Sequence, residues 1–193
     1  MSEKKLEGAG LRGQVAGKTS LSTVGKAGKG LTYRGYPIEV LSEKAKFEEV
    51  AYLLMYGSLP NKDEYENYSS KLISMRSLPN PILEVLERIP ASAHPMDVMR
   101  TGCSMLGNIE PEGEFSNQQE SADRILATMA SIIVYWYKYS HEGKKVNTSS
   151  DYETIGGHFL SLLHGDEPSE DHIRCLDTSL ILYAEHGFNA STF

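Results

Sequence analysis

The chain has 193 residues, of which 40% are hydrophobic and 23% are charged, a composition typical of globular proteins. Its formal net charge of −7 argues against a basic binding face, so we expect no nucleic-acid partner. The sequence holds no apolar run near the ~20 residues that span a bilayer, so we expect no membrane association. The two cysteines, Cys103 and Cys175, lack metal-ligand spacing. We expect buried free thiols, no bound metal and a cytoplasmic protein.

The N-terminal region is polar and rich in glycine. Residues 1–17 have no apolar segment typical of a signal peptide, and we expect a mobile arm there. Two strand-forming runs follow, 19–24 and 31–36, and the glycine-rich loop between them predicts a β-hairpin on a helical body. This loop, residues 25–30, lacks the spacing of a P-loop, so we favour a turn over a phosphate-binding site.

From Ser42 onward the pattern is helical. Ser42 is the expected N-cap of a first helix, and Gly57 is its expected end. Asn61 and Glu64 predict a capping box for the second helix, and Pro81 suits the first turn of a short third helix. Apolar spacing predicts two buried stripes, Phe47, Val50, Ala51 and Leu54 in the first helix and Tyr65, Tyr68, Leu72 and Met75 in the second.

The middle of the chain predicts a helix that starts at Pro95, ends at Gly107 and turns Met96, Met99 and Cys103 inward. Residues 108–117 form an acidic loop in which we expect mobility. The longest helix is expected to open at Ser116 and to end at Gly143. Its centre is apolar on nearly every side, which predicts a core helix.

Two further helices complete the prediction. Asp151 is the expected cap of a helix that reaches Leu163, and Ser169 is expected to start the last helix, from Glu170 to His186. The sequence therefore predicts an all-α body of about seven helices with short connections and one small hairpin.

The six histidines are the main candidates for chemistry. We favour capping or structural roles for His141, His158, His164 and His172. His94 precedes a proline at a helix N-terminus, where an anion site and a simple turn are both open.

His186 differs from the others in its surroundings. It follows an apolar helix end that we expect to be buried, and Gly187, Asn189 and Ser191 come directly after it. Such a polar group suits a small anionic ligand, whereas a histidine that caps the helix before a glycine is the alternative. Spacing alone leaves both interpretations open.

Four blocks of the sequence resemble the bacterial citrate synthase family, in the same order and with similar spacing. They are residues 31–38, 47–60, 92–101 and 183–192, and the last contains the motif A-E-H-x-x-N-A-S-T. Within the family, residues 94–102, 135–141 and 155–165 look most like the 2-methylcitrate synthase branch. The resemblance implies that residues 18–193 form the N-terminal part of the family's large helical domain.

The resemblance implies a Claisen-type condensation of propionyl-CoA with oxaloacetate, or of acetyl-CoA in an ordinary citrate synthase. An aspartate removes the α-proton of the thioester, and histidines stabilise the enol and the developing alkoxide. His186 matches the family position that binds oxaloacetate, with Asn189 beside it and Tyr183 as a pocket wall. The CoA thioester is a substrate, so no cofactor is implied, and a homodimer is expected.

The resemblance also implies that the family's catalytic aspartate, its further histidines and its CoA-binding segments lie after Phe193. We therefore expect no catalytic residue within these 193 residues, and an inactive fragment of the enzyme. A non-catalytic helical dimerisation module is the alternative from another class.

Overall fold

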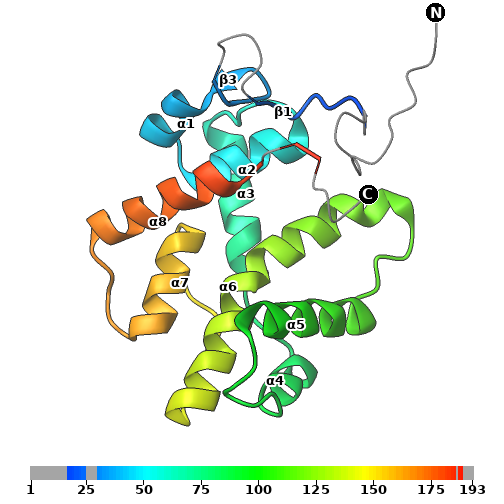
Figure 1. Ribbon diagram of the computed structural model, residues 1–193, viewed down its shortest axis with the longest axis vertical. Coiled ribbons are helices and arrows are strands. Elements are labelled where there is room, and N and C mark those ends of the chain that lie inside the picture. The colour runs from blue at the N-terminus through cyan, green and yellow to red at the C-terminus, as the bar shows by residue number, and fades with distance from the viewer. Residues whose placement is uncertain (1–16, 25–29, 186, 189–193) are drawn as a thin grey trace, which may run out of the picture.

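The computed structural model describes residues 17–24, 30–185, 187 and 188. Within these residues it has eight α-helices, one 3₁₀ helix and a small three-stranded sheet (Figure 1). The predicted all-α body with a small N-terminal β element is confirmed. In this part of the chain, none of the helices combines the length and the apolar character needed to cross a membrane. The predicted arm at residues 1–17 and the loop at 25–29 lie outside the described residues, apart from Gly17.

The small sheet is antiparallel, in the order β1 (Ser22–Thr23), β2 (Thr32–Tyr33), β3 (Tyr36–Pro37). Our second strand-forming run is in fact two strands, because the chain reverses at Arg34 and Gly35. These residues have φ of 47° and 90°, which suits a tight two-residue turn.

The first predicted helix is two helices, α1 (Ile38–Lys44) and α2 (Phe47–Tyr56). Ser42 is therefore not an N-cap: it lies inside α1, and its hydroxyl donates to the Glu39 carbonyl at 3.1 Å. At the start of α2, the Lys46 N–H donates instead to the Glu49 carboxylate at 2.8 Å. Gly57 ends α2 as predicted, with φ of 98°.

The next two helices agree with prediction. Before α3 (Lys62–Ser74), Asn61 accepts from the Glu64 N–H at 3.0 Å and donates its own N–H to the Glu64 carboxylate at 2.8 Å. This is the expected capping box. In α4 (Asn80–Leu86), Pro81 occupies the first turn.

The inner face of α5 (Pro95–Ile109) differs from prediction. Its buried residues are Val98, Gly102 and Leu106, whereas Met96 is 64% exposed. The helix also continues past Gly107. We assigned the inner face of α5 to its large apolar side chains. In the structure α6 instead packs against α5 at Gly102.

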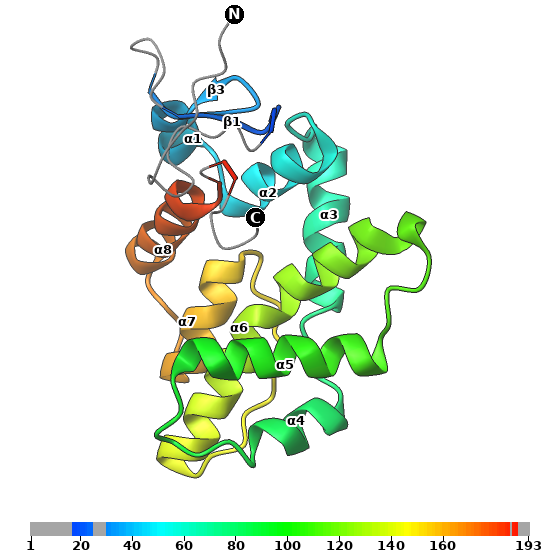
Figure 2. The same cartoon turned by 45° about the vertical axis from the view of Figure 1, so that its right-hand side comes forward.

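Helix α6 (Gln118–Glu142) is the core helix that we predicted. It packs against α3, α4, α5 and α7, and Figure 2 shows α5 lying across it. A 3₁₀ turn, η2 (Phe115–Asn117), contains Ser116, so α6 begins two residues later than expected. Gly143, with φ of 67°, ends it as predicted.

The last two helices are α7 (Ile155–His164) and α8 (Glu170–Tyr183). The last helix therefore ends at Tyr183, three residues before the predicted end at His186. Thr154 caps α7 in place of Asp151: its hydroxyl accepts from the Gly157 N–H at 2.9 Å. Ser169 caps α8 as predicted, accepting from the His172 N–H at 3.3 Å.

The buried apolar residues form two clusters, which α6 connects. The sheet-side cluster includes Tyr33, Leu41, Phe47, Val50, Leu53, Leu72 and Ile181. The α4–α5 cluster includes Ile82, Leu86, Val98, Leu106, Ile132, Tyr135 and Trp136. In Figure 1 the sheet, α1 and α2 lie in the upper part of the molecule, and α4 and α5 lie in the lower part.

The cysteines are both free, but they are not both buried. Cys103 is half-buried and Cys175 is exposed. Our expectation of a buried thiol is therefore wrong for Cys175, because its position on α8 faces solvent.

Candidate functional site

The predicted substrate-binding residues lie at and beyond the end of α8. Tyr183 is the last residue of that helix, and its side chain is 88% exposed. His186 and Asn189 lie outside the described residues. We call residues 184–188 the exit segment, of which the structure describes all but His186.

The end of α8 is only partly buried, which corrects our expectation of a buried helix. Ile181 is fully buried, whereas Leu182 is 47% exposed. One face of α8 packs on the sheet-side cluster, and the other remains open.

Tyr33 of β2 connects the sheet to the end of α8. Its ring is fully buried, and its hydroxyl donates to the carbonyl oxygen of Ile181 at 2.9 Å. The carbonyl oxygen of Leu182 lies within hydrogen-bond distance of the same hydroxyl, at 3.3 Å. The same hydroxyl accepts from the Glu185 N–H at 3.3 Å. Burial raises the pKa of the Tyr33 phenol, so it stays neutral and able to donate.

The Glu185 carboxylate holds the exit segment from the other side. Its Oε1 accepts from the Ser22 hydroxyl at 3.2 Å and from the Gly187 N–H at 2.5 Å. Gly187 has φ of 93°, a conformation that favours glycine. The Glu185 carboxylate therefore binds Ser22 of β1 and the Gly187 N–H. It links both residues that flank His186 to β1.

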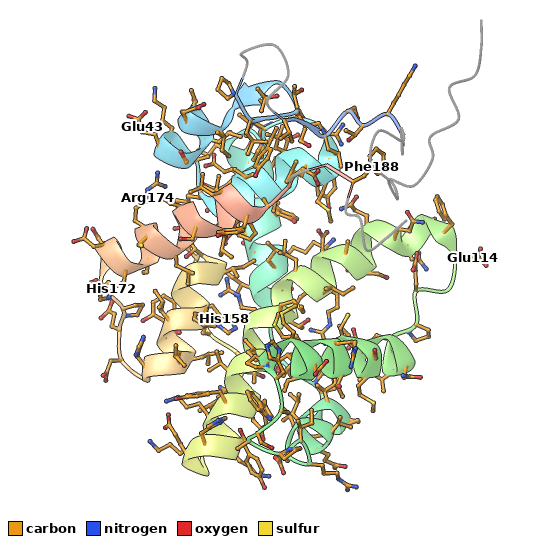
Figure 3. All side chains as sticks on the ribbon, in the orientation of Figure 1. Glu43, Glu114, His158, His172, Arg174 and Phe188 are labelled. Atoms are coloured by element: carbon orange, nitrogen blue, oxygen red, sulfur yellow. The ribbon has the colours of Figure 1, made fainter. Side chains whose placement is uncertain are left out.

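The end of the exit segment lies near the start of the described chain. A Cβ atom on Gly17 would come within 2.9 Å of the Phe188 ring. Figure 3 labels Phe188 at the tip of this segment, beside the N-terminal strand. Sequence reasoning found the segment but missed Tyr33 and Ser22, which no local spacing relates to it.

A buried carboxylate pair lies at the N-terminus of α7. Glu48 of α2 is fully buried, and its Oε1 accepts from the Ile155 N–H at 2.6 Å. Asp177 of α8 lies against Gly156 in the same turn. Burial raises the pKa of Glu48 to about 7 and that of Asp177 to about 6. The helix N-terminus favours these carboxyls as acceptors.

A second buried polar group surrounds His158 between α6 and α7 (Figure 3). Its Nε2 lies 2.9 Å from the Ser131 hydroxyl and its Nδ1 lies 2.7 Å from the Ser150 hydroxyl. Burial, with Arg76 nearby, lowers its pKa to about 3, so the ring is neutral. These contacts agree with the structural role that we favoured for His158.

Asp123 of α6 is the centre of a third buried group. Its carboxylate accepts from the Tyr56 hydroxyl at 2.9 Å, from the Tyr68 hydroxyl at 3.0 Å and from the Lys71 ammonium at 2.7 Å. Each of its bonds goes to α2 or α3, so the group fixes the packing of α6 on those helices.

His94 has a local role in the structure. Its Nδ1 accepts from the Met96 N–H at 3.2 Å, which makes it the N-cap of α5. This geometry supports the simple turn over the anion site. His141 lies in the last turn of α6 and stacks on Tyr137, which agrees with its predicted capping position.

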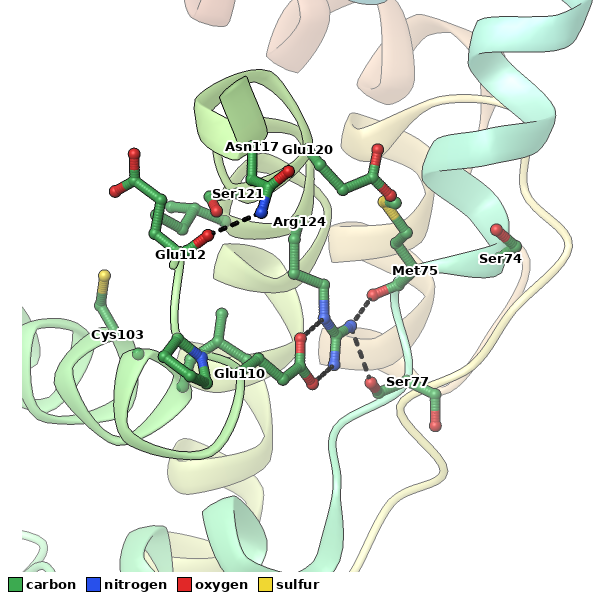
Figure 4. Close-up of a pocket in the computed structure, with 14 residues that line it drawn as sticks. Ser74, Met75, Ser77, Cys103, Glu110, Glu112, Asn117, Glu120, Ser121 and Arg124 are labelled. Atoms are coloured by element: carbon green, nitrogen blue, oxygen red, sulfur yellow. Dashed lines mark hydrogen bonds and ion pairs between the residues drawn. The ribbon is translucent and has the colours of Figure 1, made fainter. Parts of the chain in front are cut away.

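A cavity of about 640 Å³ opens between α5, η2 and the start of α6 (Figure 4). Arg124 lines it, but its guanidinium is already paired with both carboxylate oxygens of Glu110, at 2.7 and 2.8 Å, and with the carbonyls of Met75 and Ser77. This cation is therefore not available to an anionic ligand. No predicted site residue that the structure describes lines this cavity.

In the described part of the chain, no three His, Cys, Asp or Glu side chains come together in a way that could hold a metal ion. Glu48, Asp123 and Glu185 instead accept hydrogen bonds from a backbone N–H or from hydroxyl groups.

Comparison with known proteins agrees with the family resemblance. The family model described as the citrate synthase C-terminal domain matches residues 10–193. A 2-methylcitrate synthase of Shewanella oneidensis is 63% identical over 190 residues, covering 98% of this chain and 51% of that protein. A 2-methylcitrate synthase of Corynebacterium glutamicum is 35% identical over 192 residues, covering 95% and 50%.

Solved structures give the same result. The citrate synthase of Thermotoga maritima superposes with a TM-score of 0.80 at 32% identity, over 95% of this chain and 48% of that one. The citrate synthase of Pyrobaculum aerophilum gives 0.83 at 30%, with the same coverage. The chain spans about half the length of the curated relatives that it matches. By its sequence and its fold, the chain belongs to the citrate synthase family.

Proposed function

We propose that this chain is part of a 2-methylcitrate synthase, an enzyme that condenses propionyl-CoA with oxaloacetate to give 2-methylcitrate and CoA. The 63% identity with the Shewanella oneidensis enzyme is the observation that carries this proposal. The enzyme is an acyltransferase of the citrate synthase family, and its CoA thioester is a substrate and not a resident cofactor.

In this proposal the exit segment binds oxaloacetate. The His186 imidazole and the Asn189 side chain give charge-assisted hydrogen bonds to the dicarboxylate. Tyr183 forms a wall of the pocket, and its exposure leaves it open to a facing surface from outside these residues. The hydrogen bonds of Glu185, Gly187 and Tyr33 support the proposal because they fix the chain on both sides of His186.

The proposal assigns no catalytic residue to these 193 residues and expects no condensation from them alone. It places the enzyme in the cytoplasm as a homodimer. An ordinary citrate synthase that uses acetyl-CoA is the second candidate, supported by a citrate synthase of Acidithiobacillus ferridurans that is 34% identical over 192 residues.

The test is a chimera in which this chain replaces the matched half of the Shewanella oneidensis enzyme. We expect the chimera to release CoA from propionyl-CoA and oxaloacetate, with kcat/KM above that for acetyl-CoA. The two acyl groups differ by one methylene, which contributes only ~1–3 kcal/mol of substrate discrimination in an apolar pocket. The expected preference in kcat/KM is therefore about 10- to 200-fold.

The unmodified relative is the control for the chimera. A chimera that loses the control's preference for propionyl-CoA and prefers acetyl-CoA would support the second candidate. A folded chimera with no condensation activity, beside an active control, would contradict the proposal and favour the non-catalytic helical module.

A further inference from the structure

The residues that face the exit segment come from one cross-strand pair of the small sheet. Ser22 of β1 lies directly opposite Tyr33 of β2. Side chains at opposed positions of two antiparallel strands project from the same face of the sheet. The hairpin register therefore puts two hydroxyl groups side by side, and both bind the exit segment.

The Tyr33 hydroxyl acts on the main chain of α8. The last carbonyls of a helix lack part of their intrahelical donors, although the Ile181 carbonyl accepts from the Ala184 N–H at 3.3 Å. Tyr33 supplies a donor to Ile181 and an acceptor to the Glu185 N–H. It thereby fixes the direction in which the chain leaves α8.

The Ser22 hydroxyl acts on a side chain. It donates to Glu185 Oε1, which also accepts from the Gly187 N–H. The Ser22 hydroxyl is therefore linked to Gly187, the residue after His186, through the carboxylate of Glu185, the residue before it. Together the two hydroxyls fix the exit segment at Glu185 and at Gly187, and the Phe188 ring lies close to Gly17.

We propose that Ser22 and Tyr33 are positioning residues for oxaloacetate binding, which act through Glu185 on the course of the chain around His186. This inference rests on the proposed function. The two residues belong to a sheet that precedes the helical body by sequence, and neither is part of the motif at 183–192. A slip of the β1–β2 register by one residue would turn the two hydroxyls to opposite faces and abolish the arrangement.

Tyr33→Phe in the chimera is the principal variant, because it removes one hydroxyl and keeps the buried ring. A net hydrogen bond is worth about 0.5–1.5 kcal/mol, so we expect the Kd for oxaloacetate, measured by calorimetry, to rise about three- to tenfold. The KM for propionyl-CoA should stay within about twofold. Hydrogen exchange of the amides at 184–188 should become faster.

Ser22→Ala tests the second hydroxyl without disturbing the core. We expect a smaller rise in the Kd for oxaloacetate, about two- to threefold, and Ser22→Thr should restore the original Kd because it returns the hydroxyl. If Tyr33→Phe does not fold, this pair of variants decides the question.

Tyr135→Phe is the matched control. Tyr135 is 2% exposed, and its hydroxyl donates to Glu87 at 2.6 Å in the α4–α5 cluster. We expect a similar fall in Tm with no change in the Kd for oxaloacetate. A general loss of stability would act equally in both tyrosine variants, and positioning would not.

An unchanged oxaloacetate Kd in both Tyr33→Phe and Ser22→Ala would overturn the inference. An equal loss of affinity for oxaloacetate and propionyl-CoA would also overturn it, because it would indicate a general structural effect. A parent chimera with no condensation activity would instead contradict the proposed function, and hydrogen exchange at 184–188 would still test the anchoring.

Discussion

Gly102 on α5 lies against Ile132 of α6, and this contact leaves no room for a side chain. A Cβ atom at Gly102 would lie 2.5 Å from the Cγ2 atom of Ile132. We expect Gly102→Ala to lower the free energy of unfolding by about 1–3 kcal/mol, because α5 or Ile132 must move. Urea unfolding of the chain measures this change.

Gly107 is the control on the same helix. It is exposed, and a Cβ atom there meets nothing within 4 Å among the described residues. Gly107→Ala should therefore raise the free energy of unfolding by up to about 1 kcal/mol through helix propensity. Equal destabilisation by both variants would contradict the contact with Ile132.

The buried pair of Glu48 and Asp177 makes stability depend on pH near neutrality. Burial is the main reason that both pKa values are raised. Asp177 adds to the rise for Glu48 and Arg76 opposes it, while Arg174 and Lys46 lower the pKa of Asp177 and Glu153 raises it. The net pKa values of about 7 and about 6 exceed the usual values of 4.5 and 3.8. The folded chain therefore binds these protons more tightly than the unfolded chain.

The stability from this pair is fully present below about pH 4 and is lost as the pH rises through 6 and 7. Glu48 alone accounts for up to about 3 kcal/mol. We expect the free energy of unfolding to fall between pH 5.5 and pH 8, and to fall less in Glu48→Gln, which keeps an acceptor for the Ile155 N–H. Parallel pH profiles for the two proteins would contradict these pKa shifts.

His186 carries the proposed oxaloacetate contact. We expect His186→Ala in the chimera to raise the KM for oxaloacetate or to lower kcat, with a loss in kcat/KM of at least tenfold. His172→Ala is the control, because His172 is exposed in the first turn of α8. Unchanged kinetics in His186→Ala would assign that histidine to helix capping.

At the scale of an element, α7 shows how a helix N-terminus is stabilised from three directions. Thr154 caps it locally, Glu48 reaches it from α2, and Asp177 lies against it from α8. We expect Thr154→Ala to cost about 1 kcal/mol of stability. Asp151→Ala should change stability by less than about 0.5 kcal/mol. The reverse order in thermal unfolding would restore Asp151 as the cap.

Local signals predicted those element boundaries that depend on neighbouring residues. The Asn61–Glu64 capping box, the Ser169 cap and the Gly57 and Gly143 ends all form within a few residues of the chain. The inner face of α5 was not predictable in this way, because Gly102 is buried through the shape of α6 and not through its own hydrophobicity.

The same limit applies to the candidate site. The motif at 183–192 was recognisable in the sequence, whereas the two residues that hydrogen-bond to this region, Ser22 and Tyr33, were not. Tyr33 and Ile181 are 148 positions apart, and Ser22 and Glu185 are 163 apart. Hydroxyl groups at such distances carry no periodic signal, so only the folded structure relates them to the exit segment.

At the scale of the whole molecule, several large apolar side chains remain exposed. Met96, Phe115 and Tyr183 are 64%, 81% and 88% exposed. They lie on three different elements, α5, η2 and α8, where a second protein surface could cover them. We expect sedimentation of the chain at tens of micromolar to give a dimer or a larger species, as the proposed homodimer requires. A clean monomer would contradict this expectation.

The contact between Tyr33 and the end of α8 also sets an order of events during synthesis. Translation proceeds at about 5–20 residues per second, so the 148 positions between Tyr33 and Ile181 separate their synthesis by about 7–30 seconds. The α4–α5 cluster draws on residues 78–136 and can form in that interval. The small sheet, in contrast, is synthesised before its partner α8, so the Tyr33 hydroxyl has no contact with Ile181 during that interval. Chaperones and proteases can therefore bind the sheet before α8 packs on it.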